Sequence, residues 1–328
     1  MRISTRMGYS SFNNNISRLQ EQTYFNLLRK STGKDIQCIA DAPTRLMDSK
    51  KLIAQKNMKE NYIFHNEYAV NEMRSGEDVA KAIADDFQKI RELSINSTNV
   101  SIDGTVSALA VYIRGIVTDI VRNANTDFNG KYMFSGTMTT PNSIENANPG
   151  MTNMPYEFIM DENTRKFEVV FKGNNDVRTI NKDGHSNEVI NMTSEQLFGA
   201  GGIDYFAPII EIYDILMFKP DGSGDIREPF DYLTRDEVQR VADLQSVIAL
   251  NIEKIDNETA MYAARRERID AVNLQMVEEV VRLKEVNSLK EDVDMPKLLT
   301  QLAQEENALQ YSLSAGASIN KYSLFQYI

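Results

Sequence analysis

The sequence has few of the residues that build metal, redox and disulfide sites. Its 328 residues include one cysteine, two histidines and no tryptophan. The single cysteine, Cys38, excludes a disulfide within the chain and a thiolate metal site within one copy. We interpret His65 as a packing residue in an aromatic stretch and His185 as a turn residue, because neither has a neighbour pattern typical of a catalytic triad. We therefore expect no metal and no cofactor.

Long hydrophobic runs and an excess of positive charge are also missing. No apolar run approaches the roughly 18 residues of a membrane-spanning helix. The opening residues 1–5 lack the apolar core of a cleavable secretory signal, so we expect none. The formal net charge is −11, whereas nucleic acids and anionic membrane surfaces attract basic proteins. We therefore expect neither as a partner, and we assign the acidity to solubility.

The remaining clusters of polar residues do not indicate an enzyme. Residues 221–225 begin like a calcium loop, but Ile226 and Tyr232 stand where a glycine and a glutamate are required. The glycines of residues 199–202 lack the spacing of a dinucleotide-binding fingerprint. Acidic pairs such as Glu278-Glu279 are interpreted as solvated helix faces. The sequence therefore predicts no catalytic residue.

What the sequence does contain is an apolar stripe near each end. Steps of three or four residues place such side chains on one face of a helix, and a sustained spacing of 3.5 is typical of coiled coils. Two such helices at opposite ends of a chain are natural partners for each other or for a neighbouring subunit. We predict subunit contacts at Phe12, Ile16, Leu19 and Leu27, and at Leu299, Leu302, Leu309 and Leu313.

The regions between the stripes differ in texture. Residues 7–135 carry helical patterns, with Gly33 suited to end the first helix and Pro43 to begin the next. Gly76 predicts a kink or break in that second helix, and a turn is expected near residues 103–104. Residues 129–130, Asn-Gly, predict a tight turn.

The middle of the chain loses the helical period. Residues 136–232 are rich in glycine, proline, asparagine and aspartate, and they predict strands over 167–171 and 177–180 and a short helix over 209–218. From 235 to 288 the helical period returns without glycine or proline, which predicts a helix of about 50 residues, or roughly 75 Å.

The predicted fold is mainly α with an inserted β-rich domain, and the terminal segments form a long helical hairpin or coiled-coil rod. Residues 1–42 with 290–328 are expected to be terminal core segments, frayed in the free monomer. Residues 43–135 with 235–289 are expected to form a helical rod domain, and residues 136–234 the inserted outer domain.

Several short strings resemble the flagellin superfamily. Met1-Arg2-Ile3-Ser4-Thr5, Ile16 to Gln20 and Ser31-Thr32-Gly33-Lys34 are similar to its amino-terminal helix, and residues 129–136 to the segment before its inserted domain. Residues 264–269 resemble its long return helix. The opening and the tail, Asp292 to Met295 and Ser323 to Ile328, are most similar to the hook–filament junction family, hook-associated protein 3. The loop Ile39 to Pro43 departs from the family's Pro-Ser-Asp-Asp-Pro.

This resemblance implies a flagellin-like fold and a structural role. Members pair their terminal helices in a tubular core and face the β insert outward. A junction protein would contact hook-associated protein 1, flagellin and copies of itself in a ring, and a flagellar export chaperone would hold its carboxy-terminal segment. It would be extracellular, in the bacterial flagellum, after type III export without a cleaved signal. A flagellin is the alternative, and a coiled-coil adhesin or chaperone is a third interpretation.

Overall fold

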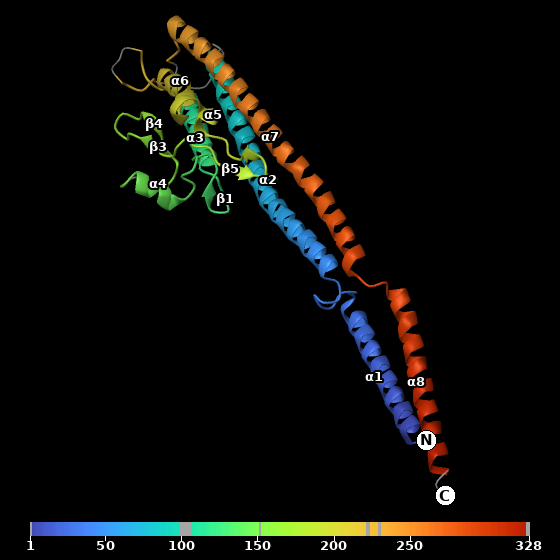
Figure 1. The fold of residues 1–328 in the computed structure, drawn as a ribbon. Helices are drawn as coiled ribbons and strands as arrows, with labels where there is room; N and C mark the ends of the chain where they lie inside the picture. The colour runs from blue at the N-terminus through green and yellow to red at the C-terminus, as the bar shows by residue number, and fades with distance from the viewer. Residues whose placement is uncertain (1, 99–105, 151, 221–223, 229–230, 326–328) are drawn as a thin grey trace. The chain divides into compact units, whose positions relative to one another are not determined.

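The computed structural model is dominated by long helices. It describes residues 2–98, 106–150, 152–220, 224–228 and 231–325 (Figure 1). The long helices are α1 (Arg2–Thr32), α2 (Pro43–Thr98), α3 (Val106–Ala124), α7 (Arg235–Glu291) and α8 (Met295–Phe325). The chain divides into two compact units, unit 1 with residues 1–60 and 277–328, and unit 2 with residues 61–276. None of the described helices has the length and apolar character that crossing a membrane requires.

Unit 2 is built on α3 and on the parts of α2 and α7 that belong to it. The predicted stripes form its core: Ile83 and Phe87 of α2, Ile113 and Ile120 of α3, and Ile248 of α7 are fully buried. Their spacing of three to four residues, or its multiples, gives each helix one apolar face, and burial of these faces holds the helices together. The helical interpretation of these segments is confirmed.

The expected break at Gly76 is absent, because α2 runs through it without interruption. The reason for the glycine is a close approach by α7. A Cβ atom at Gly76 would lie 3.1 Å from the hydroxyl oxygen of Tyr262. That hydroxyl donates a hydrogen bond of 3.0 Å to the carbonyl of Ile190. Gly76 therefore accommodates a neighbouring ring at a point where α2 continues as a helix.

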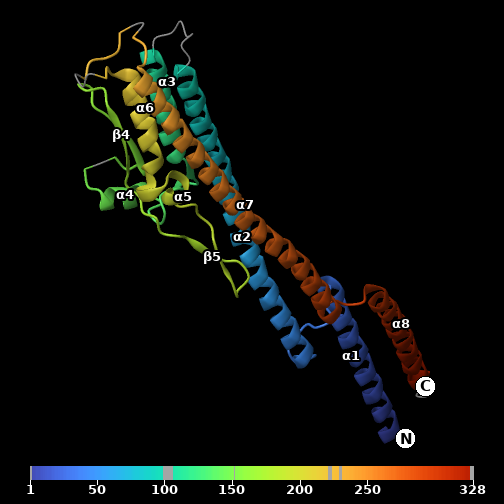
Figure 2. The same ribbon diagram turned by 90° about the horizontal axis from the view of Figure 1, so that it is seen from above.

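The described residues in the central part of unit 2 form short elements. Among them, three two-stranded antiparallel sheets pair consecutive strands, and short helices separate or follow the sheets (Figure 2). The sheets are β1 (Asp127–Phe128) with β2 (Lys131–Tyr132), β3 (Tyr156–Met160) with β4 (Phe167–Phe171), and β5 (Thr179–Asn181) with β6 (Asn187–Val189). The helices are α4 (Pro141–Ala147), α5 (Ser194–Phe198) and α6 (Ala207–Met217), with 3-10 turns η1 (Ala200–Gly202) and η2 (Asp204–Phe206).

Local sequence chemistry explains several of these elements. Asn129 and Gly130 have φ angles of 53° and 75°, the left-handed conformation that a two-residue hairpin turn between β1 and β2 requires. This confirms the predicted turn. Aromatic rings join the sheets to the helices: Phe198 lies 5.2 Å from Tyr156 and 6.5 Å from Phe87, between ring centroids. The small central part is thereby attached to α2.

The fold class is that expected, mainly α with short antiparallel strands in the middle of the chain. The division into terminal, rod and inserted domains stays a prediction. The turn expected at residues 103–104 lies outside the described residues, as do residues 221–223 of the calcium-like loop.

Candidate functional site

In unit 1, helix α1 packs antiparallel to α8 (Figure 1). Three contacts along the pair show the direction. Phe12 lies against Gly316, Asn26 bonds to Glu305, and Lys34 forms a main-chain bridge with Asp292. The segments that the sequence shows at opposite ends of the chain are therefore partners within one copy.

The seam between the two helices is apolar at several levels. On α1, Phe12, Ile16 and Leu19 are half-buried at steps of three or four. On α8, Leu298 and Leu302 are buried at the same spacing. The ring of Phe12 is accommodated because residue 316 is a glycine, where a Cβ would lie 2.2 Å from the Phe12 Cζ atom. The pair is thus stabilised by the usual helix-to-helix burial of apolar side chains.

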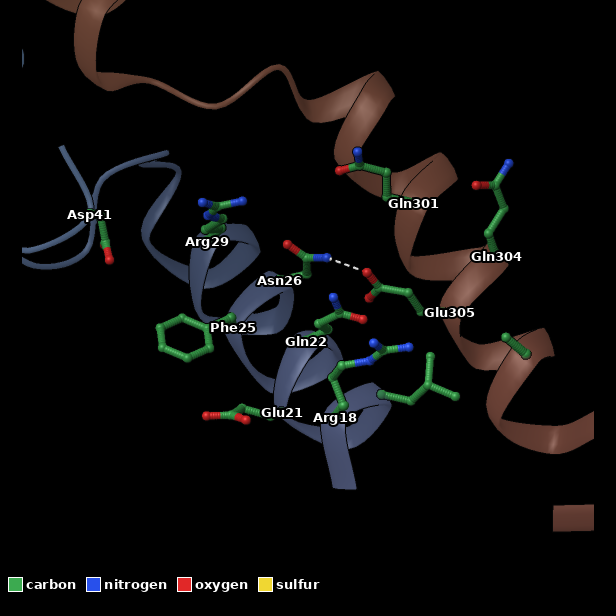
Figure 3. Close-up of a pocket in the computed structure, with 12 residues that line it drawn as sticks. Arg18, Glu21, Gln22, Phe25, Asn26, Arg29, Asp41, Gln301, Gln304 and Glu305 are labelled. Atoms are coloured by element: carbon green, nitrogen blue, oxygen red, sulfur yellow. Dashed lines mark hydrogen bonds between the residues drawn. The ribbon is translucent and has the colours of Figure 1, made fainter. Parts of the chain in front are cut away.

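A polar contact interrupts the seam. The Asn26 side-chain amide is buried and donates a 2.8 Å hydrogen bond to Glu305 Oε1. A groove of about 670 Å³ surrounds this bond (Figure 3). Gln22 and Gln301 line it from the two helices, and Phe25 also lines it although its ring points away from α8. A buried polar pair costs stability compared with apolar packing, and in coiled coils it fixes the register of the helices.

A short clasp joins the segment after α1 to the end of α7 and the segment that follows it. Gly33 ends α1 with a φ of 71°, as its position predicted. The amide of Asp35 then donates to the carbonyl of Glu291 at 2.7 Å, and the amide of Val293 donates to the carbonyl of Gly33 at 3.0 Å. These main-chain bonds fix where both connecting segments run.

The carboxylate of Glu291 is the polar centre of this clasp. It accepts hydrogen bonds from the Lys34 ammonium group at 2.6 Å, the Ser49 hydroxyl at 3.0 Å and the Asn287 amide at 3.1 Å. The bond from Lys34 is the main reason why the pKa of Glu291 falls below its ordinary value of 4.5. Three stretches of chain, the segment after α1, the start of α2 and the end of α7, therefore meet at one charged group.

The predicted contact residues lie in two different environments. Five of them are covered within the chain: Leu302 is buried, and Phe12, Ile16, Leu19 and Leu309 are half-buried. The other three, Leu27, Leu299 and Leu313, are exposed. Both helices of the pair therefore keep apolar side chains on their outer surfaces.

Further exposed apolar residues on the same helices were not in the predicted set. Besides Met295 at the start of α8, they are Met7, Tyr24, Phe25 and Tyr311. These last four residues lie beside the predicted stripes, so a search for apolar residues at steps of three or four does not find them. They could have been found by counting the large apolar residues of each helix, because there are more of them than one narrow seam can bury.

The chemistry available at this site is packing. Within the described residues, no group of three or more His, Cys, Asp or Glu side chains is arranged to hold a metal ion. The α1–α8 pair has a surface of exposed leucine and aromatic side chains, with amide and charged side chains next to it, that a partner could contact.

Comparisons with known proteins agree with this architecture. Residues 3–139 match the family described as the bacterial flagellin N-terminal helical region. This confirms the flagellin resemblance for the N-terminal part of the chain. A comparison with curated proteins found no match.

Solved structures share the fold at low sequence identity. A flagellar hook-associated protein of Vibrio parahaemolyticus is 16% identical with a TM-score of 0.59, and the match covers 76% of this chain and 99% of that one. FlgL of Xanthomonas campestris is 14% identical with a TM-score of 0.53, and the match covers 73% of this chain and 99% of that one. The chain therefore has a flagellin-like fold that hook-associated proteins also have.

Proposed function

We propose that this chain, with its flagellin-type N-terminal region and its fold shared with hook-associated proteins, is the structural junction protein between the hook and the filament of the bacterial flagellum. The observation that carries the proposal is the α1–α8 pair, which leaves Leu27, Leu299 and Leu313 exposed on its outer surfaces. Exposed apolar residues gathered on one pair of helices mark an interaction surface. The protein acts by packing and carries out no reaction.

The partners follow from this position in the flagellum. Hook-associated protein 1 lies on the hook side, flagellin lies on the filament side, and copies of the chain form a ring between them. The terminal segments, 1–42 and 290–328, form the inner layer. Residues 43–135 and 235–289 form the next layer, and residues 136–234 face outward.

The protein reaches this position by export. It leaves the cell through the flagellar type III apparatus without a cleaved signal, and a chaperone covers the carboxy-terminal segment beforehand. Tyr311 and Leu313 on α8 are exposed in the free chain and are suited to such cover. A single cysteine also suits export, since no disulfide within the chain has to be opened.

A flagellin is the second candidate function, because the match over residues 3–139 is to a region named for flagellin itself. Abundance separates the two. A flagellin makes up most of the filament mass, whereas a junction protein is a trace component at the base of the filament. Quantitative mass spectrometry of sheared filaments measures the ratio.

A gene deletion tests the proposal. Cells without the protein are expected to keep intact hooks, to lose attached filaments and to release flagellin into the medium. Re-expression of the full chain should restore attachment. Deletion cells whose filaments stay attached to the hooks would contradict the junction role, and cells that make no flagellin at all would favour the flagellin interpretation.

A further inference from the structure

A groove beside the clasp has an apolar floor and a basic rim. Its volume is about 880 Å³, and it lies between the 36–39 segment and the first turns of α2. Ile36 and Leu46 line it, and Ile39 and Met47 line it while remaining 72% and 64% exposed. We call it the α2 groove. A groove with large exposed apolar side chains is unfavourable in water unless another surface covers it.

Two lysines give the α2 groove its charge. Lys50 and Lys51 both line it and are both exposed. Among the ion pairs of the described residues, neither lysine has a carboxylate partner, whereas Lys34 on the same groove is paired with Glu291. The groove is therefore suited to an apolar surface that also carries negative charge.

The last turns of α7, also in unit 1, carry such a surface. Val277, Val281 and Leu289 are exposed there, Leu289 at 85%. At 100° per residue these side chains spread over about 120° of the helix. Glu278 and Glu285 fall within the same arc and are exposed.

Another side of α7 is already used within the chain. Val280 and Glu291 are buried there, and Lys290 bonds to Asp48 of α2. The outer arc therefore stays uncovered within one copy. We call this arc, with its three apolar and two acidic side chains, the α7 ridge.

We propose that the α7 ridge of one copy docks into the α2 groove of the next copy, with Glu278 and Glu285 beside Lys50 and Lys51. The proposal rests on the function proposed above and names one surface by which copies pack in the ring. Ridge and groove are different patches, so the contact is head-to-tail, and repeated head-to-tail contacts generate rings or helical arrays. The partner is a second copy because each copy carries both complementary patches.

Cys38 provides a direct test because it lines the α2 groove and is exposed. The full-length Val281→Cys variant has one thiol in the groove and one on the ridge. A short bis-maleimide should then link successive copies into a ladder that extends beyond the dimer. The V281C/C38A variant should give no ladder. Tyr112→Cys, at an exposed position of α3 in unit 2, should give none either.

A charge exchange tests the complementarity. Lys50→Glu with Lys51→Glu in the V281C background should lower the yield of the ladder about tenfold, which corresponds to roughly 1.4 kcal/mol. Adding Glu278→Lys and Glu285→Lys should restore it. Circular dichroism of each variant checks that the helices remain folded.

The outcomes separate this inference from the proposed function. No ladder in the concentrated protein and none in flagella isolated from cells making V281C would overturn the ridge-and-groove contact. A linked dimer of the wild-type protein through Cys38 alone would also overturn it, because that contact would be symmetric. Filament attachment in the same cells reports independently on the junction role. If the ladder forms but cells with the gene deleted keep their filaments attached, the contact between copies is supported and the junction function is rejected.

Discussion

At the scale of single residues, positions with a left-handed backbone conformation restrict which amino acids can replace the glycine found there. Gly130 and Gly136 both have positive φ, at 75° and 68°. They differ in surroundings: a Cβ at Gly136 would lie 2.2 Å from the backbone oxygen of Asn174, whereas nothing lies within 4 Å at Gly130. The same substitution at these two positions therefore separates backbone strain from steric overlap.

We expect Gly136→Ala to destabilise unit 2 more than Gly130→Ala. The Gly130 variant carries only the cost of a left-handed alanine, about 1 kcal/mol. The Gly136 variant must also move the Asn174 backbone, so we expect about 3 kcal/mol in total. Urea unfolding followed by circular dichroism measures both. Equal losses in the two variants would contradict the role given to Asn174.

Glu291 makes the clasp sensitive to acid. Because its folded pKa is lowered, its contribution to stability is fully present above the ordinary value of 4.5 and is lost as the pH falls through the folded pKa. Glu291→Gln should therefore weaken the clasp at pH 7, by about 2 kcal/mol, the size typical of a charged hydrogen bond. The variant should also lose this pH dependence.

Hydrogen exchange at the Asp35 and Val293 amides measures opening of the clasp, because both amides bond across it. Glu306→Gln, at an exposed position of α8, is the matched control and should change neither rate. Unchanged protection of Asp35 and Val293 in the Glu291 variant would show that the carboxylate does not hold the clasp.

At the scale of elements, the polar pair in the α1–α8 seam gives a testable asymmetry. Asn26→Leu should destabilise the pair by roughly 1–3 kcal/mol, since it leaves the Glu305 carboxylate without its amide donor. Glu305 Oε2 is already buried with no bonding partner among the described residues. The double variant, Asn26→Leu with Glu305→Leu, should regain that stability.

Limited proteolysis of α1 measures this pairing, because an unpaired terminal helix is cleaved faster. Asn14→Leu, at an exposed position of α1, should leave the cleavage rate unchanged. If the double variant is cleaved faster than the single one, the pair stabilises the seam by itself and does not only set its register.

Helix existence could be predicted from the sequence, whereas the orientation of each helix could not. The three-to-four period placed α1, α3, α7 and α8 correctly because each buries one face. The same period does not decide between adjacent residues on a broad apolar face. Within the chain the seam buries Asn26 and Leu298, and their neighbours Leu27 and Leu299 are exposed. Only the position of the partner helix determines that choice.

The candidate site shows the same limit. Gly33 and Pro43 mark the ends of the connecting segment through local backbone preferences, so both could be predicted. The Glu291 clasp depends on contacts between residues more than 240 positions apart in the sequence, such as Ser49 with Glu291. No local pattern carries that information. The break expected at Gly76 was wrong for the same reason, because Tyr262 lies far away in the chain.

At the scale of the whole molecule, the proposed role requires that folding and assembly use different leucines of α8. Leu302 is 5% exposed and Leu313 is 53% exposed. Leu302→Asp places a charge in the seam and should unpair α1 from α8 in the free protein. Leu313→Asp should leave the unfolding of the free protein unchanged and prevent attachment of filaments to hooks, since it charges a surface that a neighbour must cover.

Leu309 is half-buried, so Leu309→Asp should impair both the pairing and the attachment while unit 2 stays folded. Gln310→Glu is the matched control: it adds a charge at an exposed position without removing an apolar side chain, and it should preserve attachment. Urea unfolding of the purified variants and electron microscopy of the cells measure the two effects separately. If the Leu313→Asp protein is incorporated and filaments attach normally, Leu313 is not part of the assembly surface. Loss of filament attachment in the Gln310→Glu control would instead show that an added negative charge is enough to prevent attachment, without the loss of an apolar side chain.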